Sequence, residues 1–206
     1  MKYLFPPRPK SKTTPIDLPI YEKMGQWVIQ RKFNGTRNLI CIDLNGVIKF
    51  YNRYGKPHAR YQPSKNIIKS IQNLNLDQGK DYILDGELMN KQKGNPEIVV
   101  LYDVLMCGRY LFSHPDQQKR LDILNQICRN PKEKSNLGYV ISEQLMLAEN
   151  WKENFVEHFN ESLPDPMIEG LVLRKKSVGL DNFGQSEYET NSLIRCRKAI
   201  DTGYNF

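Results

Sequence analysis

The residue types in this chain that are most able to do chemistry are cations and carboxylates that interrupt apolar runs. Strand interiors rarely contain such groups unless the protein uses them. In chain order they are Lys32, Arg37, Asn52, Arg53, Asp85, Glu87, Asp103, Glu169, Arg174, Lys175, Arg195, Arg197 and Lys198. A sheet that gathers them would form a pocket with several cations and at least two acids. Such a pocket suits a triphosphate and a divalent metal, because Lys and Arg neutralise phosphate and carboxylates bind the metal.

Each of these signals also has a simpler interpretation. The segment "KFNGTR" (32–37) is typical of the basic rim of a hairpin, and "DGE" (85–87) of a turn with a solvated carboxylate. The run "EGLVL" (169–173), followed by cations, is compatible with an edge strand protected by charge. The last cations are compatible with a solvated basic terminus. Their joint occurrence along one chain favours the pocket.

The elements that must position these residues are mostly strands. Short β-branched or aromatic runs predict strands at 26–31, 37–43, 46–52, 82–88, 97–105, 167–175 and 192–198. Helical spacing of apolar residues predicts helices over 64–74 behind Ser64, from Pro115 onward with Leu121, Leu124 and Cys128 on one face, and along Trp151, Phe155 and Phe159. Strands without strict helix alternation indicate an α+β fold with largely antiparallel sheets and flanking helices.

Residues 1–25 are proline-rich and show little apolar periodicity, so we expect an irregular N-terminal arm, with one domain over 26–206. The 206 residues contain no apolar run long enough to span a bilayer and no secretory signal, which favours an intracellular, cytoplasmic protein without a membrane partner. The four cysteines lie far apart and are expected to be reduced thiols. We also expect a monomer.

The net charge of +7 is unevenly distributed. Residues 1–69 contain 14 Lys or Arg and 3 Asp or Glu, a local charge of +11, which leaves −4 for the remainder. This asymmetry indicates either a polyanionic partner on one face or a solvated basic surface.

Taken together, the motifs resemble those of the covalent nucleotidyltransferase superfamily: ATP-dependent DNA ligases, RNA ligases and mRNA capping enzymes. The segments that carry the resemblance run from about residue 26 to 198: "KFNGTR" (32–37), "NRYGKP" (52–57), "LDGEL" (84–88), "LYDVL" (101–105), "EGLVLR" (169–174) and "LIRCRK" (193–198). The resemblance implies the ATP-grasp-like nucleotidyltransferase fold of a ligase adenylation domain.

The resemblance also implies roles in catalysis and nucleotide binding. Lys32 would attack the α-phosphate of ATP and carry AMP as a phosphoramidate, and Gln30 would read the adenine edge. Tyr102, whose flat ring also suits the purpose independently, would stack on the purine. Glu87 would contact the ribose or a metal, and Glu169 would hold the metal, Mg²⁺ or Mn²⁺. Arg37 and Arg53 would bind the ribose and phosphates or the 5′-phosphate of the polynucleotide. The positions of family lysines that touch the α-phosphate are occupied by Arg174, Arg195 and Arg197, with Lys175 and Lys198 as adjacent substitutes.

Three departures from the family pattern stand out. Asn34 replaces an aspartate after the nucleophile, and it cannot balance a cation. Arginine replaces lysine in the last two strands; it binds phosphate in a bidentate fork and does not deprotonate. The chain ends at Phe206, so we expect no C-terminal OB-fold domain, either because the protein is a minimal ligase or because the sequence is a piece of a longer one.

The expected substrate is a nicked duplex, with DNA favoured over RNA. ATP is favoured over GTP, and over NAD because too few residues precede Lys32 for a further domain. Residues expected to bind the nucleic acid are Lys10, Lys12, Arg53, Lys56, Arg60 and Lys65. The alternatives are an RNA ligase, an mRNA-capping guanylyltransferase and a non-catalytic nucleic-acid-binding module. We assign no role to the histidines.

Overall fold

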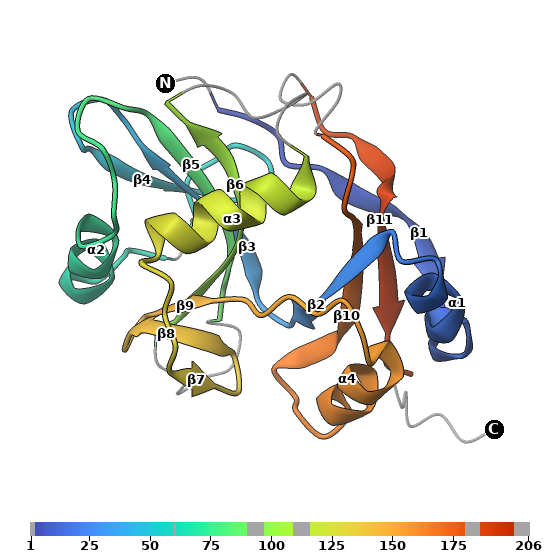
Figure 1. The fold of residues 1–206 in the computed structure, drawn as a ribbon. Coiled ribbons are helices and arrows are strands. Elements are labelled where there is room, and N and C mark those ends of the chain that lie inside the picture. The colour runs from blue at the N-terminus through green and yellow to red at the C-terminus, as the bar shows by residue number, and fades with distance from the viewer. Residues whose placement is uncertain (1–2, 60, 90–96, 109–115, 180–185, 200–206) are drawn as a thin grey trace.

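The computed structural model describes residues 3–59, 61–89, 97–108, 116–179 and 186–199. Two sheets organise this part of the chain (Figure 1). The smaller sheet has the order β1-β11-β10-β2, formed by β1 (Arg8–Thr13), β11 (Glu189–Arg197), β10 (Ile168–Lys175) and β2 (Trp27–Phe33). The larger sheet has the order β4-β3-β5-β6-β9-β8-β7, formed by β4 (Ile48–Tyr51), β3 (Thr36–Ile42), β5 (Tyr82–Leu88), β6 (Val99–Cys107), β9 (Leu145–Leu147), β8 (Gly138–Ser142) and β7 (Lys134–Ser135).

Most strand pairs are antiparallel, and the described parallel pairs are β1 with β11 and β6 with β9. Among the described residues, five short helical segments flank the sheets: η1 (Pro15–Asp17), α1 (Leu18–Lys23), α2 (Lys65–Gln72), α3 (Gln117–Ile127) and α4 (Phe155–Ser162). In Figure 1, α3 crosses in front of β6, while α1 and α4 lie together on the outer side of the smaller sheet. The predicted α+β class with largely antiparallel sheets is confirmed.

Each sheet has its own apolar core. In the larger sheet, Ile40, Leu84 and Leu101 are fully buried and contact the inner face of α2, where Ile67 and Ile71 lie. In the smaller sheet, the core residues are Leu18, Trp27, Ile29, Phe155, Phe159, Leu171, Leu173, Ile194 and Cys196. The four cysteines are free thiols. No described helix has the length and apolar character needed to cross a membrane.

Local sequence explains where α2 and α3, which pack against the larger sheet, begin. Ser64 caps α2 by accepting a hydrogen bond from the backbone N–H of Ile67 at 3.3 Å. Asp116 caps α3 in the same way, accepting from the N–H of Lys119 at 3.0 Å. The prediction for α2 was therefore correct in its cap, whereas α3 begins at Gln117 and the expected start at Pro115 lies outside the described residues.

The structure corrects two other expectations about elements. Residues 1–25 are not an irregular arm, because β1 is a strand of the smaller sheet and α1 contributes the fully buried Leu18 to its core. Trp151 is not part of a helix: α4 begins at Phe155, and Trp151 instead bridges to Ile29 of β2 through two backbone hydrogen bonds.

Candidate active site

A cavity of about 620 Å³ is lined by residues of both sheets. The smaller sheet provides side chains from β2, β10 and β11, and the larger sheet provides side chains from β3, β5 and β6. The loop after β4 closes one side with Asn52, Arg53 and His58. All residues predicted to bind the nucleotide line this cavity: Gln30, Lys32, Arg37, Arg53, Glu87, Tyr102, Glu169, Arg174, Arg195 and Arg197.

Strand register brings the predicted nucleophile to a carboxylate. Lys32 on β2 lies opposite Gly170 on β10, which in turn lies opposite Arg197 on β11. Glu169, next to Gly170, accepts a hydrogen bond from Lys32 Nζ through Oε2, and the same oxygen lies 3.4 Å from an Arg197 guanidinium nitrogen. The Lys32 and Glu169 side chains are 20% and 26% exposed, so this ion pair can be reached from the cavity.

The turn after Lys32 explains the departure at Asn34. Its side-chain N–H₂ donates to the carbonyl of Pro166 at 3.3 Å, and its backbone N–H donates to the carbonyl of Met167 at 2.8 Å. An aspartate could not donate to Pro166. A Cβ on Gly35 would lie 2.5 Å from the carbonyl oxygen of Leu88, so this glycine permits close packing against β5. The φ angle of Gly35 is not positive, so the glycine is needed at this bend for space rather than for a left-handed backbone.

Arg37 is held rigidly beside the cavity. Its Nε donates to Asp85 at 3.0 Å, a second guanidinium nitrogen contacts the other Asp85 oxygen, and a third donates to the carbonyl of Pro7 at 2.8 Å. Burial alone would lower the pKa of Arg37, but the charge and hydrogen bonds of Asp85, together with the nearby Tyr102 and Glu87, outweigh burial and raise the pKa. Asp85, to which the motif reading gave no role, is thus the partner that orients this cation.

Tyr102 contributes an aromatic face to the cavity wall, and Gln30 contributes a polar amide. Burial raises the pKa of Tyr102 well above its ordinary value, so the phenol stays neutral. The Tyr102 ring lies 5.2 Å from the guanidinium of Arg174 and 5.9 Å from that of Arg37. Gln30 donates through Nε2 to the backbone carbonyl of Tyr102 at 3.1 Å and to Asn150 Oδ1 at 2.7 Å. An aromatic face and an amide edge therefore lie together.

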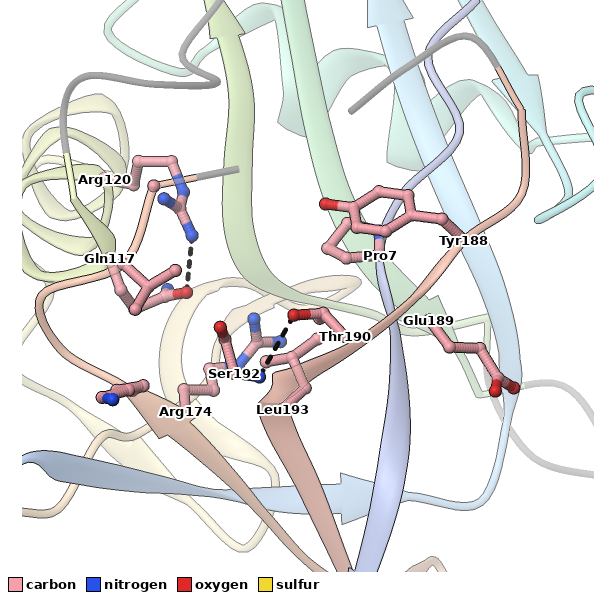
Figure 2. A pocket seen from close by; sticks show the side chains of 12 residues that line it. Pro7, Gln117, Arg120, Arg174, Tyr188, Glu189, Thr190, Ser192 and Leu193 are labelled. Carbon is pink, nitrogen blue, oxygen red and sulfur yellow. Dashed lines mark hydrogen bonds between the residues drawn. The ribbon is translucent and has the colours of Figure 1, made fainter. Parts of the chain in front are cut away.

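Arg174 separates this cavity from a second one of about 210 Å³, shown in Figure 2. It shares the buried carboxylate of Asp103 with Arg120, at 3.2 Å and 3.0 Å respectively. Gln117 accepts a hydrogen bond from Arg120. Burial alone would raise the pKa of Asp103, but Arg120 and Arg174 outweigh it, so the pKa is lowered. Asp103 thus holds the guanidinium groups of Arg120 and Arg174 in place behind the cavity wall.

Some lining residues were missed by the motifs. Arg8 on β1 lines the cavity and forms an ion pair with Glu187 at 2.9 Å, and its buried Nε has no partner among the described residues. His58 lines it too, 3.0 Å from Asn38 Oδ1, and burial lowers the pKa of its ring. The Nε of Arg195, a predicted residue, is likewise buried without a described partner. Arg8 carries no sequence signal, because its position depends on the pairing of β1 with β11.

Other predicted residues lie elsewhere. Lys198 donates to the carbonyls of Leu163 and Asp165, and Lys175 lines the smaller cavity, so neither substitutes for a cation of the larger one. The exposed side chains of Lys10, Lys12, Lys56 and Lys65 do not line the cavity. They do not form one surface either, since α2, which begins at Lys65, and β1 lie on opposite sides of the molecule (Figure 1). Arg60 lies outside the described residues.

The described residues contain no cluster of three or more His, Cys, Asp or Glu side chains that could hold a metal alone. Glu87 and Glu169 nevertheless line the same cavity as several cations. Mg²⁺ commonly uses one or two carboxylates together with substrate phosphate oxygens. The donor set therefore fits a divalent ion that arrives with a triphosphate.

Comparison with known proteins places this geometry in a family context. Residues 12–99 match the family described as "ATP dependent DNA ligase domain". No curated protein matches the chain in sequence. Among solved structures, the ligase domain of LigD from M. tuberculosis is 17% identical, with a TM-score of 0.66; the match covers 94% of this chain and 59% of that one.

Two further structures are similar in fold. The ATP-dependent DNA ligase from bacteriophage T7, in complex with ATP, is 11% identical with a TM-score of 0.56, over 91% of this chain and 67% of that one. A Lig E DNA ligase, described as binding DNA with a minimal scaffold, is 12% identical with a TM-score of 0.53, over 94% and 69%. The chain thus spans about 59% of the LigD ligase domain. It shares the fold of these solved ATP-dependent DNA ligase domains, and residues 12–99 match the family described as "ATP dependent DNA ligase domain" in sequence.

Proposed function

We propose that this protein is an ATP-dependent DNA ligase that seals nicks between a 5′-phosphate and a 3′-hydroxyl through a lysyl-AMP intermediate. The observation that carries the proposal is the hydrogen-bonded pair of Lys32 and Glu169, reachable from a cavity that also holds Tyr102 and Gln30. A nucleophilic amine, an acceptor for its proton, a stacking face and a base-reading amide are the parts that adenylation needs.

In the first step, the neutral amine of Lys32 attacks the α-phosphorus of ATP. A new N–P bond forms while the P–O bond to pyrophosphate breaks, and pyrophosphate leaves with its electron pair. The ammonium gives up one proton before the attack and a second as the bond forms. The first proton passes to water, and we assign Glu169 as the acceptor of the second, because its Oε2 is already hydrogen-bonded to Nζ.

The cations around the amine bind and orient the phosphates. Arg197 lies within 3.4 Å of Glu169, and Arg195 has a buried guanidinium nitrogen without a described partner that a phosphate oxygen could satisfy. Arginine remains charged throughout, so these residues serve as fixed electrostatic contacts. Glu87 and Glu169 would hold a Mg²⁺ or Mn²⁺ ion, whose charge helps to neutralise the triphosphate.

In the later steps, AMP passes from Lys32 to the 5′-phosphate of the nick, and the 3′-hydroxyl then displaces AMP. The DNA assignment is supported by the match of residues 12–99 to a DNA ligase domain and by the similarity to solved DNA ligases. Arg53, at the cavity mouth and exposed, is suited to a backbone phosphate.

Incubation with α-labelled ATP and Mg²⁺ or Mn²⁺ tests the first step. We expect an acid-labile covalent adduct that is lost in Lys32→Ala and retained in Lys69→Ala, an exposed lysine of α2. Absence of an adduct with either metal would favour a non-catalytic binding module instead. An adduct formed from GTP rather than ATP would indicate a capping enzyme.

A sealing panel tests the substrate. Nicked duplexes with DNA–DNA, RNA–DNA and RNA–RNA strands at the nick are offered to the protein with ATP. We expect sealing of the DNA nick at the highest rate. Preferential sealing of RNA nicks would replace the DNA assignment with an RNA ligase.

A further inference from the structure

We infer that Asn150 is a positioning residue that sets the nucleotide preference of the site, by fixing the orientation of the Gln30 side-chain amide. The inference rests on the proposed function, in which Gln30 faces the base of the nucleotide. Asn150 follows β9 and lies outside every motif quoted above. It lines a separate outer cavity, on the other side of Gln30 from the active-site cavity.

An amide side chain is ambiguous as a base reader, because one end accepts hydrogen bonds and the other donates them. Its two orientations are resolved only by its neighbours. Gln30 is 2% exposed and cannot rely on bulk water to satisfy it. The orientation of this amide therefore has to be set by the protein.

The neighbours leave one orientation. The backbone carbonyl of Tyr102 can only accept, and it lies 3.1 Å from Gln30 Nε2. The Asn150 side chain is itself fixed, because its Nδ2 donates to the backbone carbonyl of Ala148 at 3.2 Å. Its Oδ1 therefore faces Gln30 and accepts the second N–H at 2.7 Å. Both donors of Gln30 are used.

The consequence is that Oε1 is the polar group of the Gln30 side chain left for a ligand. No described residue donates a hydrogen bond to Oε1. An acceptor pairs with the 6-amino group of adenine, whereas it faces the 6-oxo group of guanine or hypoxanthine acceptor to acceptor. The two hydrogen bonds that link Ala148, Asn150 and Gln30 thus favour a 6-aminopurine over a 6-oxopurine.

The test compares ATP, purine riboside triphosphate (which lacks the 6-amino group) and inosine triphosphate in adduct formation. Loss of one hydrogen bond corresponds to about tenfold in rate. We expect the wild type to prefer ATP over purine riboside triphosphate by about tenfold, and to react still less with inosine triphosphate. In Asn150→Ala we expect both preferences to shrink at least threefold, because one of the two acceptors that hold the Gln30 amide is lost and the Tyr102 carbonyl alone holds it less firmly.

Two further variants separate positioning from stability. Asn125→Ala is the matched control, since Asn125 is also a half-buried asparagine of the outer cavity, but its side chain donates to the Leu121 carbonyl and not to Gln30. It should keep the wild-type ratios. Asn150→Asp keeps an acceptor oxygen for Gln30 and should retain more of the preference than Asn150→Ala. Each ratio is measured on one preparation, so a partial loss of folded protein cancels.

Equilibrium binding of the same three triphosphates measures the nucleotide preference without the adenylation reaction. The proteins used are Lys32→Ala and the double variant Lys32→Ala/Asn150→Ala. If the wild type forms no adduct but the Lys32→Ala protein binds ATP selectively and Asn150→Ala removes that selectivity, the ligase proposal fails and the role of Asn150 holds. Unchanged ratios in Asn150→Ala, with adducts formed normally, would overturn the role of Asn150 and leave the ligase proposal intact.

Discussion

At the scale of single residues, the charged groups of this site serve two different purposes. The pair of Lys32 and Glu169 is partly exposed at the cavity, where a bound ligand can contact it. The group of Asp103 with Arg120 and Arg174 is nearly inaccessible, with side chains between 1% and 7% exposed. A buried carboxylate between two guanidiniums fixes their positions, and removing it leaves uncompensated buried charge.

Asp103→Asn should therefore destabilise the protein strongly. We expect a loss of about 3–5 kcal/mol in the free energy of unfolding, the usual cost of breaking a buried ion pair by removing one partner. Urea unfolding measures it. Asp122→Asn, at an exposed position on α3, should change the same quantity by less than about 0.5 kcal/mol. Similar values for the two variants would contradict the anchoring role of Asp103.

The same carboxylate predicts a pH dependence. Its pKa is lowered in the folded protein, so the unfolded chain binds its proton more readily than the folded one. The stabilisation is complete above the unfolded pKa of about 3.9 and is lost as the pH falls through the folded value. The difference in unfolding free energy between wild type and Asp103→Asn should narrow below about pH 4. If the difference in unfolding free energy between the two proteins stays constant below about pH 4, the pKa of Asp103 is not lowered in the folded state.

At the scale of elements, the short connection from β2 in the smaller sheet to β3 in the larger sheet positions Lys32 and Arg37 by close contact between backbones. A Cβ on Gly35 would clash with Leu88, whereas one on Gly46 meets nothing within 4 Å but sits at a φ of +76°. These two glycines are therefore required for different reasons, space in one case and backbone angle in the other.

Gly35→Ala should impair chemistry more than Gly46→Ala. Displacing the β2–β3 connection by about 1 Å can reduce a rate about 100-fold, and we expect a loss of that order in the rate of adduct formation. Gly46→Ala should cost about 1–2 kcal/mol of stability and leave the adduct rate near the wild type. Thermal unfolding and the labelling rate measure both effects; equal labelling rates would show that the β2–β3 connection tolerates the shift.

The strands that carry motifs were predictable, because their apolar runs and charged interruptions are both local. The strand β1, with the sequence RPKSKT, was not predictable, since it has no apolar alternation and forms against the edge of β11, which lies far along the chain. The short strands β7 and β9, of 2 and 3 residues, were missed for lack of length. Side-chain roles such as Asp85 with Arg37, or Asn150 with Gln30, depend on contacts that no spacing reveals.

A chain that begins at Thr14 should show what β1 contributes. It lacks the pairing to β11, the Pro7 carbonyl that holds Arg37, and Arg8 in the cavity. We expect a lower melting temperature and loss of the AMP adduct. The double variant Lys10→Ala/Lys12→Ala removes only exposed side chains of β1 and should label like the wild type. Normal labelling of the shortened chain would mean that β1 is dispensable.

At the scale of the whole molecule, the site exists only where two sheets meet. One sheet contributes the nucleophile and most cations, and the other contributes Arg37, Glu87 and Tyr102. The basic loop after β4 lies at the cavity, whereas α2 lies beyond the larger sheet (Figure 1). Only part of the positive charge can therefore contact a nucleic acid bound at this site.

The salt dependence of binding to a nicked duplex should distinguish the cations near the cavity from those on α2. Each phosphate contact contributes about 0.9 to the slope of log K against log salt concentration. Arg53→Ala/Lys56→Ala should therefore reduce the slope by about two. Lys65→Ala, on α2, should leave it unchanged. A reduced slope for Lys65→Ala would show that the nucleic acid reaches the far side of the larger sheet.

The pairing of β1 with β11 has a consequence for synthesis of the protein. Residues near positions 8 and 195 must meet, and β2 must meet β10, so the smaller sheet has a high contact order. On the ribosome, Lys32 emerges well before the strands that bear Glu169 and Arg197, since Glu169 follows it by 137 residues. A nascent chain therefore exposes the lysine before β10 and β11 exist, and under the proposed function it should not form the AMP adduct until those strands have been made and paired.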